Sequence, residues 1–395
     1  MRKAHLNYCE RPFKKKIVEK KKLNYIRDMK TAKLLPLLLL FPFCISAEEY
    51  LNERNFIECA PELTLCAGEN ELCGPTYFFE GDFLYWTARE EGLAYASTSR
   101  APENATASVA KGEVFSPKPE WAPGFQIGAG VLFPEDFWEV FANYTYSTFS
   151  TSGSAKTPSN PNDLLVSQWN LGSPATQNNP FLSFIPINTP ITSAKSNWDL
   201  DFNAFDLMLR RNFFLGTKFY LQAQFGLKGT WQKQKYKLDF RNILFPPGVV
   251  VDQRIIARFE SDIWGVGTRG GVEGAFVLTK GLHLYGNFAL TPLLVHFDTQ
   301  REDRIIVSTN PAFLNYDLVL TKLRDEFYAI KGVFENELGL RYEYQRESKP
   351  TRFLIQLGFT SQLWSSVSAF YRRLDEVAHG DLSLYGLTVK GRVDF

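Results

Sequence analysis

Two short motifs carry the residue types of a hydrolytic site. Asp199-x-Asp201 sets two carboxylates on one side of an extended chain, and His296-x-Asp298 sets an imidazole beside a carboxylate in the same way. Such groups activate a water molecule when they face one another across a cleft. However, His296 has the same parity as the apolar Leu290 of its own segment, which predicts that it points away from a polar interior. We therefore expect no enzyme, and hydrolysis is only a remote alternative.

Three cysteines could bind a metal or form disulfides. Cys59, Cys66 and Cys73 follow one another at intervals of seven residues. No histidine lies near them and their spacing is not that of a zinc site, so we expect no metal. In an oxidising compartment, an odd number of cysteines leaves one thiol that can link to a neighbouring chain. The alternative is one internal disulfide and one free thiol.

The segment 265–270 (Gly-Val-Gly-Thr-Arg-Gly) matches the glycine pattern of a dinucleotide-binding turn. Such a turn must open a helix. Here the residues that follow, Val272, Phe276 and Leu278, have the two-residue alternation of a strand. Glycines in a strand allow tight curvature or close contacts. We therefore expect structural glycines and no cofactor.

Charged residues recur at alternate positions along several predicted strands. Between Phe334 and Tyr344, for example, glutamate and arginine alternate with Leu and Tyr. An apolar core could not hold such a row of charges without pairing them. The pattern predicts that the charged side faces an enclosed centre and the apolar side faces lipid. The predicted pore-lining residues are Glu139, Lys228, Arg269, Glu273, Glu335, Glu337, Arg341, Glu343, Lys390 and Arg392.

Ten alternating segments must position these side chains. The clearest is 218–232, in which Phe, Leu, Ala and Trp take the odd positions and Gln, Lys and Thr most of the even ones. Short connections alternate with long polar ones, as periplasmic turns and external loops do in outer-membrane barrels. The short connections are 134–136, 211–216, 279–281 and 345–351, and the long ones are about 97–119, 150–195, 238–258, 298–330 and 365–380.

Four short and five long connections predict an all-β protein. The expected fold is a transmembrane antiparallel up-and-down β-barrel of about ten strands, with both chain ends on the periplasmic side. Hidden hairpins near 249–256 or 304–307 would raise the number to twelve or more. The last fifteen residues alternate in the same way and end on an aromatic residue. We expect Phe395 to be the signal that the barrel assembly machinery reads.

The beginning of the chain has the form of a secretory signal. The apolar run 34–45 follows lysines and precedes small residues, and it is too short to span a bilayer. Translation is then expected to start at Met29. The expected division of the chain is an n-region and signal peptide (1–47), a periplasmic cysteine-containing segment (48–75) and the barrel (76–395).

Removal of the signal changes the charge of the chain. Without residues 1–47, 32 basic and 40 acidic residues remain, a net charge of −8. An acidic chain argues against a nucleic-acid partner. Aromatic residues make up 15% of the chain, and barrels use them at the two membrane interfaces. The residues expected at headgroup level are Tyr85, Trp86, Trp121, Trp138 and Trp198, with ordinary packing as the alternative.

Several motifs resemble those of a known family. They are 81–86 (Gly-Asp-Phe-Leu-Tyr-Trp), 121–125 (Trp-Ala-Pro-Gly-Phe), 137–140 (Phe-Trp-Glu-Val) and 198–203 (Trp-Asp-Leu-Asp-Phe-Asn). With them the chain, from about residue 76 to its end, resembles the major-outer-membrane-protein-like porins of Legionella and the environmental chlamydiae. The resemblance implies an integral outer-membrane barrel that acts as a general porin or abundant envelope protein. It carries over no catalytic residues.

The leading hypothesis is passive diffusion of small hydrophilic solutes through the lumen, where acidic and basic rows would select polar solutes. Barrels of eight strands are usually filled by side chains, whereas those of sixteen hold a channel. The alternative is therefore a structural or adhesive barrel with a closed lumen that displays its loops, above all 150–195 and 298–330. The expected partners are outer-membrane lipid and the assembly machinery, with disulfide-linked neighbours or a homo-oligomer as further options.

Overall fold

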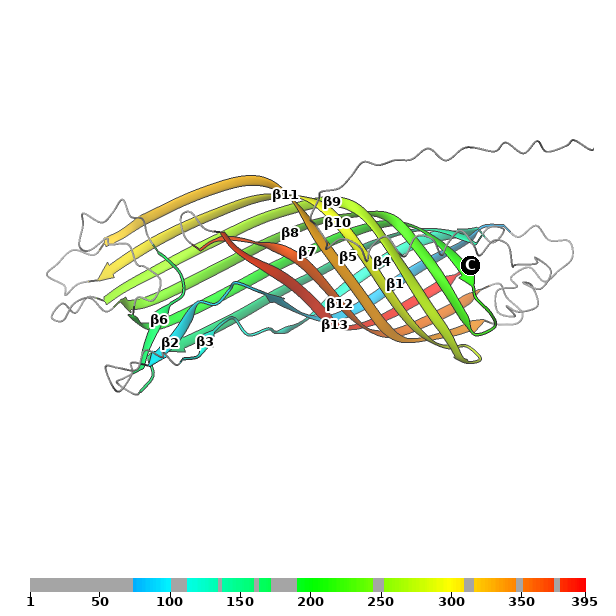
Figure 1. Cartoon of the computed structure of the whole chain (residues 1–395), viewed down its shortest axis with the longest axis horizontal. Helices are drawn as coiled ribbons and strands as arrows, with labels where there is room; N and C mark the ends of the chain where they lie inside the picture. Colours follow the sequence, from blue (N-terminus) through cyan, green and yellow to red (C-terminus); the bar gives the residue numbers. More distant parts are fainter. Residues whose placement is uncertain are drawn as a thin grey trace, which may run out of the picture. The chain divides into compact units, whose positions relative to one another are not determined.

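Ten antiparallel strands close into a ring in the computed structural model (Figure 1). The structure describes residues 74–100, 112–133, 137–159, 163–171, 190–243, 252–308, 316–345, 351–372 and 377–395. In ring order, which is also chain order, the strands are β1 (Thr76–Glu90), β4 (Trp121–Phe133), β5 (Trp138–Lys156), β7 (Pro190–Phe214), β8 (Phe219–Ile243), β9 (Asp252–Thr279), β10 (Leu282–Ser308), β11 (Tyr316–Gln345), β12 (Arg352–Tyr371) and β13 (Val377–Asp394). Each strand pairs with the next, and β13 pairs with β1. The predicted up-and-down barrel of ten strands is therefore confirmed.

Three short strands lie outside the ring. They are β2 (Ala96–Arg100), β3 (Val114–Phe115) and β6 (Asp163–Ser167). β6 pairs with the start of β7, β2 pairs with β6, and β3 pairs with β2, so the three extend the sheet from the edge of β7. In the part of the chain that is described, no helix is long and apolar enough to cross a membrane.

The described short connections, 215–218 and 280–281, lie at the same end of the barrel as the C-terminal residue, and we call it the turn end (Figure 1). Only two residues join β9 to β10, and the second, Gly281, has a φ of 78°, which glycine adopts without strain. Where the ring closes, Tyr77 and Phe395 exchange backbone hydrogen bonds of 3.0 and 2.9 Å. The ring of Phe395 also stacks on that of Phe79. The last residue thus completes the pairing of β1 with β13.

Five neighbouring strands, β7–β11, are much longer than a bilayer requires. They contain 25 to 30 residues, whereas about 9–11 residues cross the hydrocarbon. Three of the predicted long loops are wrong in extent, because most of 238–258 belongs to β8 and β9, most of 298–330 to β10 and β11, and most of 365–380 to β12 and β13. No extra hairpins form there, since 252–256 lies in β9 and 304–307 in β10.

The polarity of both faces reverses partway along the long strands. On β8, the outward positions are apolar within 219–231 and charged within 233–241. The inward positions change in the opposite sense, from polar side chains within 222–234 to buried Tyr, Leu and Phe within 236–240. We call the part of the barrel between the turn end and this reversal the turn-side half, and the remainder the loop-side half.

An apolar core fills the loop-side half. Trp169, which follows β6, packs against Tyr236 of β8 and Phe259 of β9, with ring centroids 5.6 and 4.8 Å apart. Its indole N–H donates a hydrogen bond of 2.7 Å to the carbonyl of Ala94, just before β2. Residues 163–171 were predicted to belong to an exposed loop, and this prediction is wrong, because most of their side chains are buried in this core.

Aromatic side chains form an outward girdle at the level of the reversal. The stacked pairs are Tyr85–Trp121, Tyr144–Trp231 and Trp264–His296. Aromatic rings are enriched at this position because one end of the ring is apolar and the other is wet. The sequence-based prediction is right for Tyr85 and Trp121. It is wrong for Trp86 and Trp198, whose rings are buried inside the barrel.

Candidate functional site: the charged lumen

All ten charged residues predicted to line a pore point into the turn-side half of the barrel. They are Glu139, Lys228, Arg269, Glu273, Glu335, Glu337, Arg341, Glu343, Lys390 and Arg392. They come from five of the ring strands, β5, β8, β9, β11 and β13. On each strand they take the positions that alternate with exposed apolar residues. Most of them are engaged in ion pairs that fall into three groups.

The first group surrounds Lys228 on β8. Its ammonium lies 3.0 Å from Asp206 of β7 and 2.8 Å from Glu335 of β11. The guanidinium of Arg269, on β9, also pairs with Glu335. All four side chains are less than one tenth exposed. Because β8, β9 and β10 separate β7 from β11 in the ring, this group spans part of the lumen and balances its own charges.

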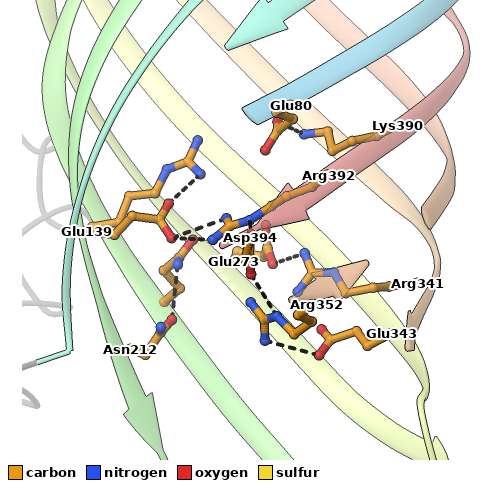
Figure 2. Close-up of polar contacts among 12 residues, drawn as sticks. Glu80, Glu139, Asn212, Glu273, Arg341, Glu343, Arg352, Lys390, Arg392 and Asp394 are labelled. Carbon is orange, nitrogen blue, oxygen red and sulfur yellow. Dashed lines mark hydrogen bonds and ion pairs between the residues drawn. The ribbon is translucent and has the colours of Figure 1, made fainter. Parts of the chain in front are cut away.

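The second group centres on Glu139 of β5, nearer the turn end (Figure 2). Arg210 of β7 and Arg392 of β13 lie 3.1 and 3.2 Å from its carboxylate. Arg392 also contacts Asp394 at 2.6 Å, and Arg352 of β12 contacts the same aspartate at 2.7 Å. Figure 2 shows Glu139 and Arg392 reaching toward each other from different strands, with Asp394 beside Arg392. Each carboxylate here has two guanidinium partners, a strong charge-assisted arrangement.

The third group lies on β1, β9, β11 and β13. The ammonium of Lys390 is 2.8 Å from Glu80 and 3.5 Å from Asp82. Arg341 of β11 pairs with Glu273 of β9, across the intervening β10. The lumen of the turn-side half therefore contains opposite charges in contact, whereas facing rows of unpaired charge would be needed for the predicted selection of polar solutes.

Sequence reasoning misses six members of this network: Glu80, Asp82, Asp206, Arg210, Arg352 and Asp394. On β1 the alternating pattern that identifies inward residues is present in the sequence, because Glu80 and Asp82 alternate with the exposed Phe79 and Phe83. The ion pairs between these residues could not be predicted from the sequence. Glu139 and Arg392 are 253 residues apart in the chain, and only the closed ring brings them together.

Two polar cavities remain among the ion pairs. One of about 220 Å³ opens at the turn end, and its lining includes Glu139, Arg210, Tyr220, His283 and Arg341. A second of about 60 Å³ lies deeper, and its lining includes Asp82, Asn143, Asp206 and Lys228. One water molecule takes roughly 30 Å³ in the liquid. The deeper cavity therefore has room for a small number of waters, and a larger solute would have to displace side chains.

Residues 167–171, which begin at the last residue of β6, lie inside the loop-side half, and we call them the plug segment. The buried guanidinium of Arg301, on β10, donates a hydrogen bond to the carbonyl of Asn170. Arg372, after β12, donates one of 2.8 Å to the carbonyl of Gln168. Two arginine side chains from distant strands thus hold the plug segment by its backbone.

Glu90, the last residue of β1, is a buried carboxyl group of the loop-side half. It lies five residues beyond Tyr85 of the girdle. Burial raises the pKa of Glu90 to about 8, although the Ser368 hydroxyl and the Gln234 amide act in the opposite direction. The group is therefore mostly protonated at neutral pH, a state that the surrounding apolar core tolerates.

The two hydrolase-like motifs do not form a common site. Asp199 and Asp201 face outward on β7, where Ser150 and Thr148 of β5 donate hydrogen bonds to them. His296 faces outward on β10, in the girdle, as its parity predicted. β8 and β9 lie between these two strands in the ring.

The glycine-rich motif is part of a strand. Segment 265–270 lies within β9, and a Cβ on Gly267 would come 1.9 Å from the carbonyl oxygen of Pro292, so this glycine allows β9 and β10 to approach closely. No three His, Cys, Asp or Glu side chains among the described residues are grouped to hold a metal ion. Outside the described residues lie Cys59, Cys66, Cys73, the predicted segment 1–47 and most of 48–75.

Residues 74–395 match a protein family described as Legionella pneumophila major outer membrane protein precursor. The match covers the whole ring and every member of the charged network. No curated protein matches the chain.

Three solved structures with some likeness to the chain are distant from it. The outer membrane protease OmpT from Escherichia coli is 10% identical, with a TM-score of 0.35 over 82% of this chain and 99% of that one. A major outer membrane protein from Thermus thermophilus is 8% identical, with a TM-score of 0.25 over 82% and 100%. The outer membrane channel DcaP of Acinetobacter baumannii is 10% identical, with a TM-score of 0.14 over 82% and 96%. TM-scores this low carry no argument about function.

Proposed function

The chain belongs to the Legionella pneumophila major outer membrane protein family and is an integral β-barrel of the bacterial outer membrane, and we infer its function from the state of its lumen. We propose that it is a structural barrel with a closed lumen that displays its loop-side half at the cell surface. Short turns of such barrels face the periplasm and the long ends face outward. The turn end is then periplasmic, and the loop-side half stands above the outer leaflet.

The observation that carries this proposal is that side chains fill the lumen at two successive levels. In the turn-side half, groups such as Lys228 with Glu335 place opposite charges in contact across the interior. In the loop-side half, Trp169 and its aromatic neighbours are buried and pack against one another in the interior. Small barrels are typically filled in this way, and ten strands are close to that size.

Passive diffusion of small hydrophilic solutes is the second candidate, and one observation favours it. The turn-side lumen is polar and holds two cavities, of about 220 and 60 Å³. Closure on the loop side depends on the plug segment, which Arg301 and Arg372 hold by its carbonyl groups. A route for solutes would begin to open if the plug segment left the barrel.

Conductance of the purified full chain in planar bilayers tests both functions. We compare the wild type with Arg301→Ala/Arg372→Ala, which frees the plug segment, and with the milder Arg372→Ala alone. A sixteen-stranded porin in the same bilayers is the positive control. The closed-barrel proposal expects no conductance steps from any of the three proteins, because the ion pairs still fill the turn-side half.

The other outcomes are equally informative. Steps that appear only in the Arg372→Ala or double variant would favour a pore gated by the plug segment. Steps of constant size in the wild type would contradict the closed lumen and favour an open porin. Heat-modifiable migration on gels shows for each variant that the barrel is folded, so that a silent trace is interpretable.

The proposal includes no catalytic step. The outward, separated positions of Asp201 and His296 support this part of it. A fluorogenic peptide library incubated with the purified barrel should show no hydrolysis above buffer. Cleavage by the wild type that disappears in Asp201→Asn would contradict it.

A further inference from the structure

Strand β11 has a neighbour on both sides along only part of its length. It pairs with β10 from Tyr316 to Tyr342, but with β12 only from Val333 to Gln345. Among the described residues, no strand pairs with the other side of segment 321–332. Figure 1 shows β11 extending on the loop side beyond β12 and β13. The segment presents a row of backbone N–H and C=O groups at the edge of the sheet, and we call it the open edge.

The open edge exists because β12 bends away from β11 into the interior of the barrel. Ser366 has a φ of 51°, in the left-handed region, and its N–H donates a hydrogen bond of 2.7 Å to the carboxylate of Asp381 on β13. Beyond this bend, Phe370 is fully buried and packs against Tyr236 of β8, with ring centroids 5.9 Å apart. The end of β12 thus contributes to the apolar core and no longer pairs with β11.

The inward side chains of the open edge are covered on one side only. On β10, Val295 and Phe297 are fully buried. Their register partners on β11, Ala329 and Phe327, point into the same interior but are only half-buried. The ring of Phe327 stacks on that of Phe297, with centroids 4.9 Å apart, so its covered side is the one toward β10. A strand on the other side of β11 would complete the burial of these apolar side chains.

The outward side chains of the open edge are charged. Arg324 lies 2.9 Å from Asp298 of β10 and 2.7 Å from Glu326 of its own strand. Lys322 is exposed, and it forms no ion pair with any described residue. Charges at a strand edge discourage indiscriminate pairing, whereas a partner with opposite charges directly across the edge is favoured. The outward row therefore selects a strand with an acidic residue opposite Lys322.

Part of the open edge lies at the level of the apolar belt. Tyr328 belongs to the girdle, where its ring contacts that of His296. Segment 329–332 continues from there toward the turn end, and the side chain of Ile330 is 78% exposed. At this depth water does not reach the backbone, and an unpaired N–H or C=O group is costly. A lipid acyl chain offers these groups no hydrogen bond, whereas another strand does.

We propose that the open edge binds an extended segment of another surface protein as an additional antiparallel strand. The backbone of such a segment matches the row of donors and acceptors on β11. Its sequence alternates apolar side chains, which cover Phe327 and Ala329, with polar or acidic ones, which face Lys322. The inference rests on the proposed display of the loop-side half at the cell surface, which makes the edge accessible to such a partner.

A synthetic peptide that copies residues 294–302 of β10 (Leu-Val-His-Phe-Asp-Thr-Gln-Arg-Glu) serves as the probe. It has the required alternation, and in β10 itself Glu302 lies opposite Lys322. Two isomers carry N-methyl groups, one on the odd-numbered residues and one on the even-numbered ones. Neighbouring residues of a strand direct their N–H groups to opposite sides, so only one isomer keeps its donors toward β11.

Fluorescence anisotropy measures binding of each labelled isomer to the purified full chain in detergent. We expect one isomer to bind like the unmethylated peptide and the other to bind at least about tenfold more weakly, because it loses several backbone hydrogen bonds. The proposal is overturned if the two isomers bind equally, or if neither they nor the unmethylated peptide bind, as expected when water alone covers the edge.

Disulfide trapping shows where the peptide binds. In a background with the three cysteines after residue 47 changed to serine, Glu326→Cys places a thiol on the open edge. Gln300→Cys is the matched control, because Gln300 is also outward and exposed but its strand, β10, is paired on both sides. A peptide with cysteine in place of Asp298, the register partner of Glu326, should be trapped by Glu326→Cys and not by Gln300→Cys.

Equal trapping by the two variants would overturn the proposal. It would also be overturned if Glu326→Cys chains linked to one another in preference to the peptide, since a second copy would then occupy the open edge. The test is independent of the proposed closed lumen, because the binding of a peptide to the purified barrel does not depend on whether the lumen conducts. A failure here leaves the conductance prediction unchanged, and conductance steps leave the open edge unchanged.

Discussion

On one strand, β8, Phe225 faces lipid and Lys228 points into a group of ion pairs, whereas farther along the same strand Lys235 faces water and Tyr236 points into an apolar core. The backbone pairing continues without change through this reversal. What changes is the solvent around the barrel, hydrocarbon at one level and water at the other. The comparison of the two halves teaches that alternation is set by the strand, and that the identity of each face is set by the medium outside it.

The largest expected effect on stability comes from Arg301, a charged residue in the apolar core of the loop-side half. Arg301 is fully buried in the loop-side half and contacts Asp303 at 2.6 Å. Arg301→Met removes the guanidinium from this pair and from the carbonyl of Asn170, so we expect a loss of about 3–5 kcal/mol in the stability of the loop-side half. Urea unfolding followed by tryptophan fluorescence measures it, because Trp169 reports on the same core.

The control for this prediction is Arg301→Met/Asp303→Leu. Replacing a buried pair by apolar residues of similar volume is often neutral, so the double variant should recover much of the lost stability. Equal losses in the single and double variants would show that Arg301 acts through the plug segment alone. The charge of Asp303 in the single variant would then cost no stability in the apolar core.

Exchanging the outward residues of the two halves gives the next largest effect. Phe225→Lys puts an ammonium on the lipid face at mid-belt, where it costs about 2–4 kcal/mol. Lys235→Phe makes the reverse change on the same strand in water, where a surface substitution typically changes stability by less than about 0.5 kcal/mol. Chemical denaturation in lipid vesicles measures both. Similar losses for the two variants would contradict the placement of the membrane boundary between these residues.

The alternation of polar and apolar residues was sufficient to predict the ring, its ten strands and the four short turns. It was insufficient for the loop-side half, because a strand with Lys and Asp on its outer face, such as 233–241, has the composition of a solvated loop. It also missed the plug segment, since Trp169 is surrounded in sequence by Ser, Asn and Gly. These residues are buried only by strands that lie far away in the chain.

The same limit applies to the lumen. Parity predicted the orientation of Glu139 and Arg392, but it could not predict that they touch. Whether inward charges line a channel or fill it depends on the circumference of the ring and on partners from opposite strands. Both are properties of the closed barrel, so the sequence left the open and the filled lumen as alternatives.

The smallest expected effect is a pH dependence confined to the loop-side half. The pKa of Glu90 is about 8 in the folded protein because burial disfavours its charged form, and it returns to about 4.5 when the chain unfolds. Between these values the folded state holds a proton that the unfolded state has released, so stability falls as the pH rises and levels off above pH 8. From pH 6 to pH 8 the loss is roughly 2 kcal/mol at about 1.4 kcal/mol per unit.

Glu90→Gln isolates this effect, because an amide of the same shape cannot ionise. Urea midpoints of the loop-side half, measured by tryptophan fluorescence at pH 6 and pH 8, should fall for the wild type and change less for the variant. The difference between the two proteins belongs to the carboxyl group, since every other titrating residue is shared. A midpoint that falls equally in both proteins would mean that Glu90 lies in contact with water. The interior of the loop-side half around Glu90 would then not be an apolar core.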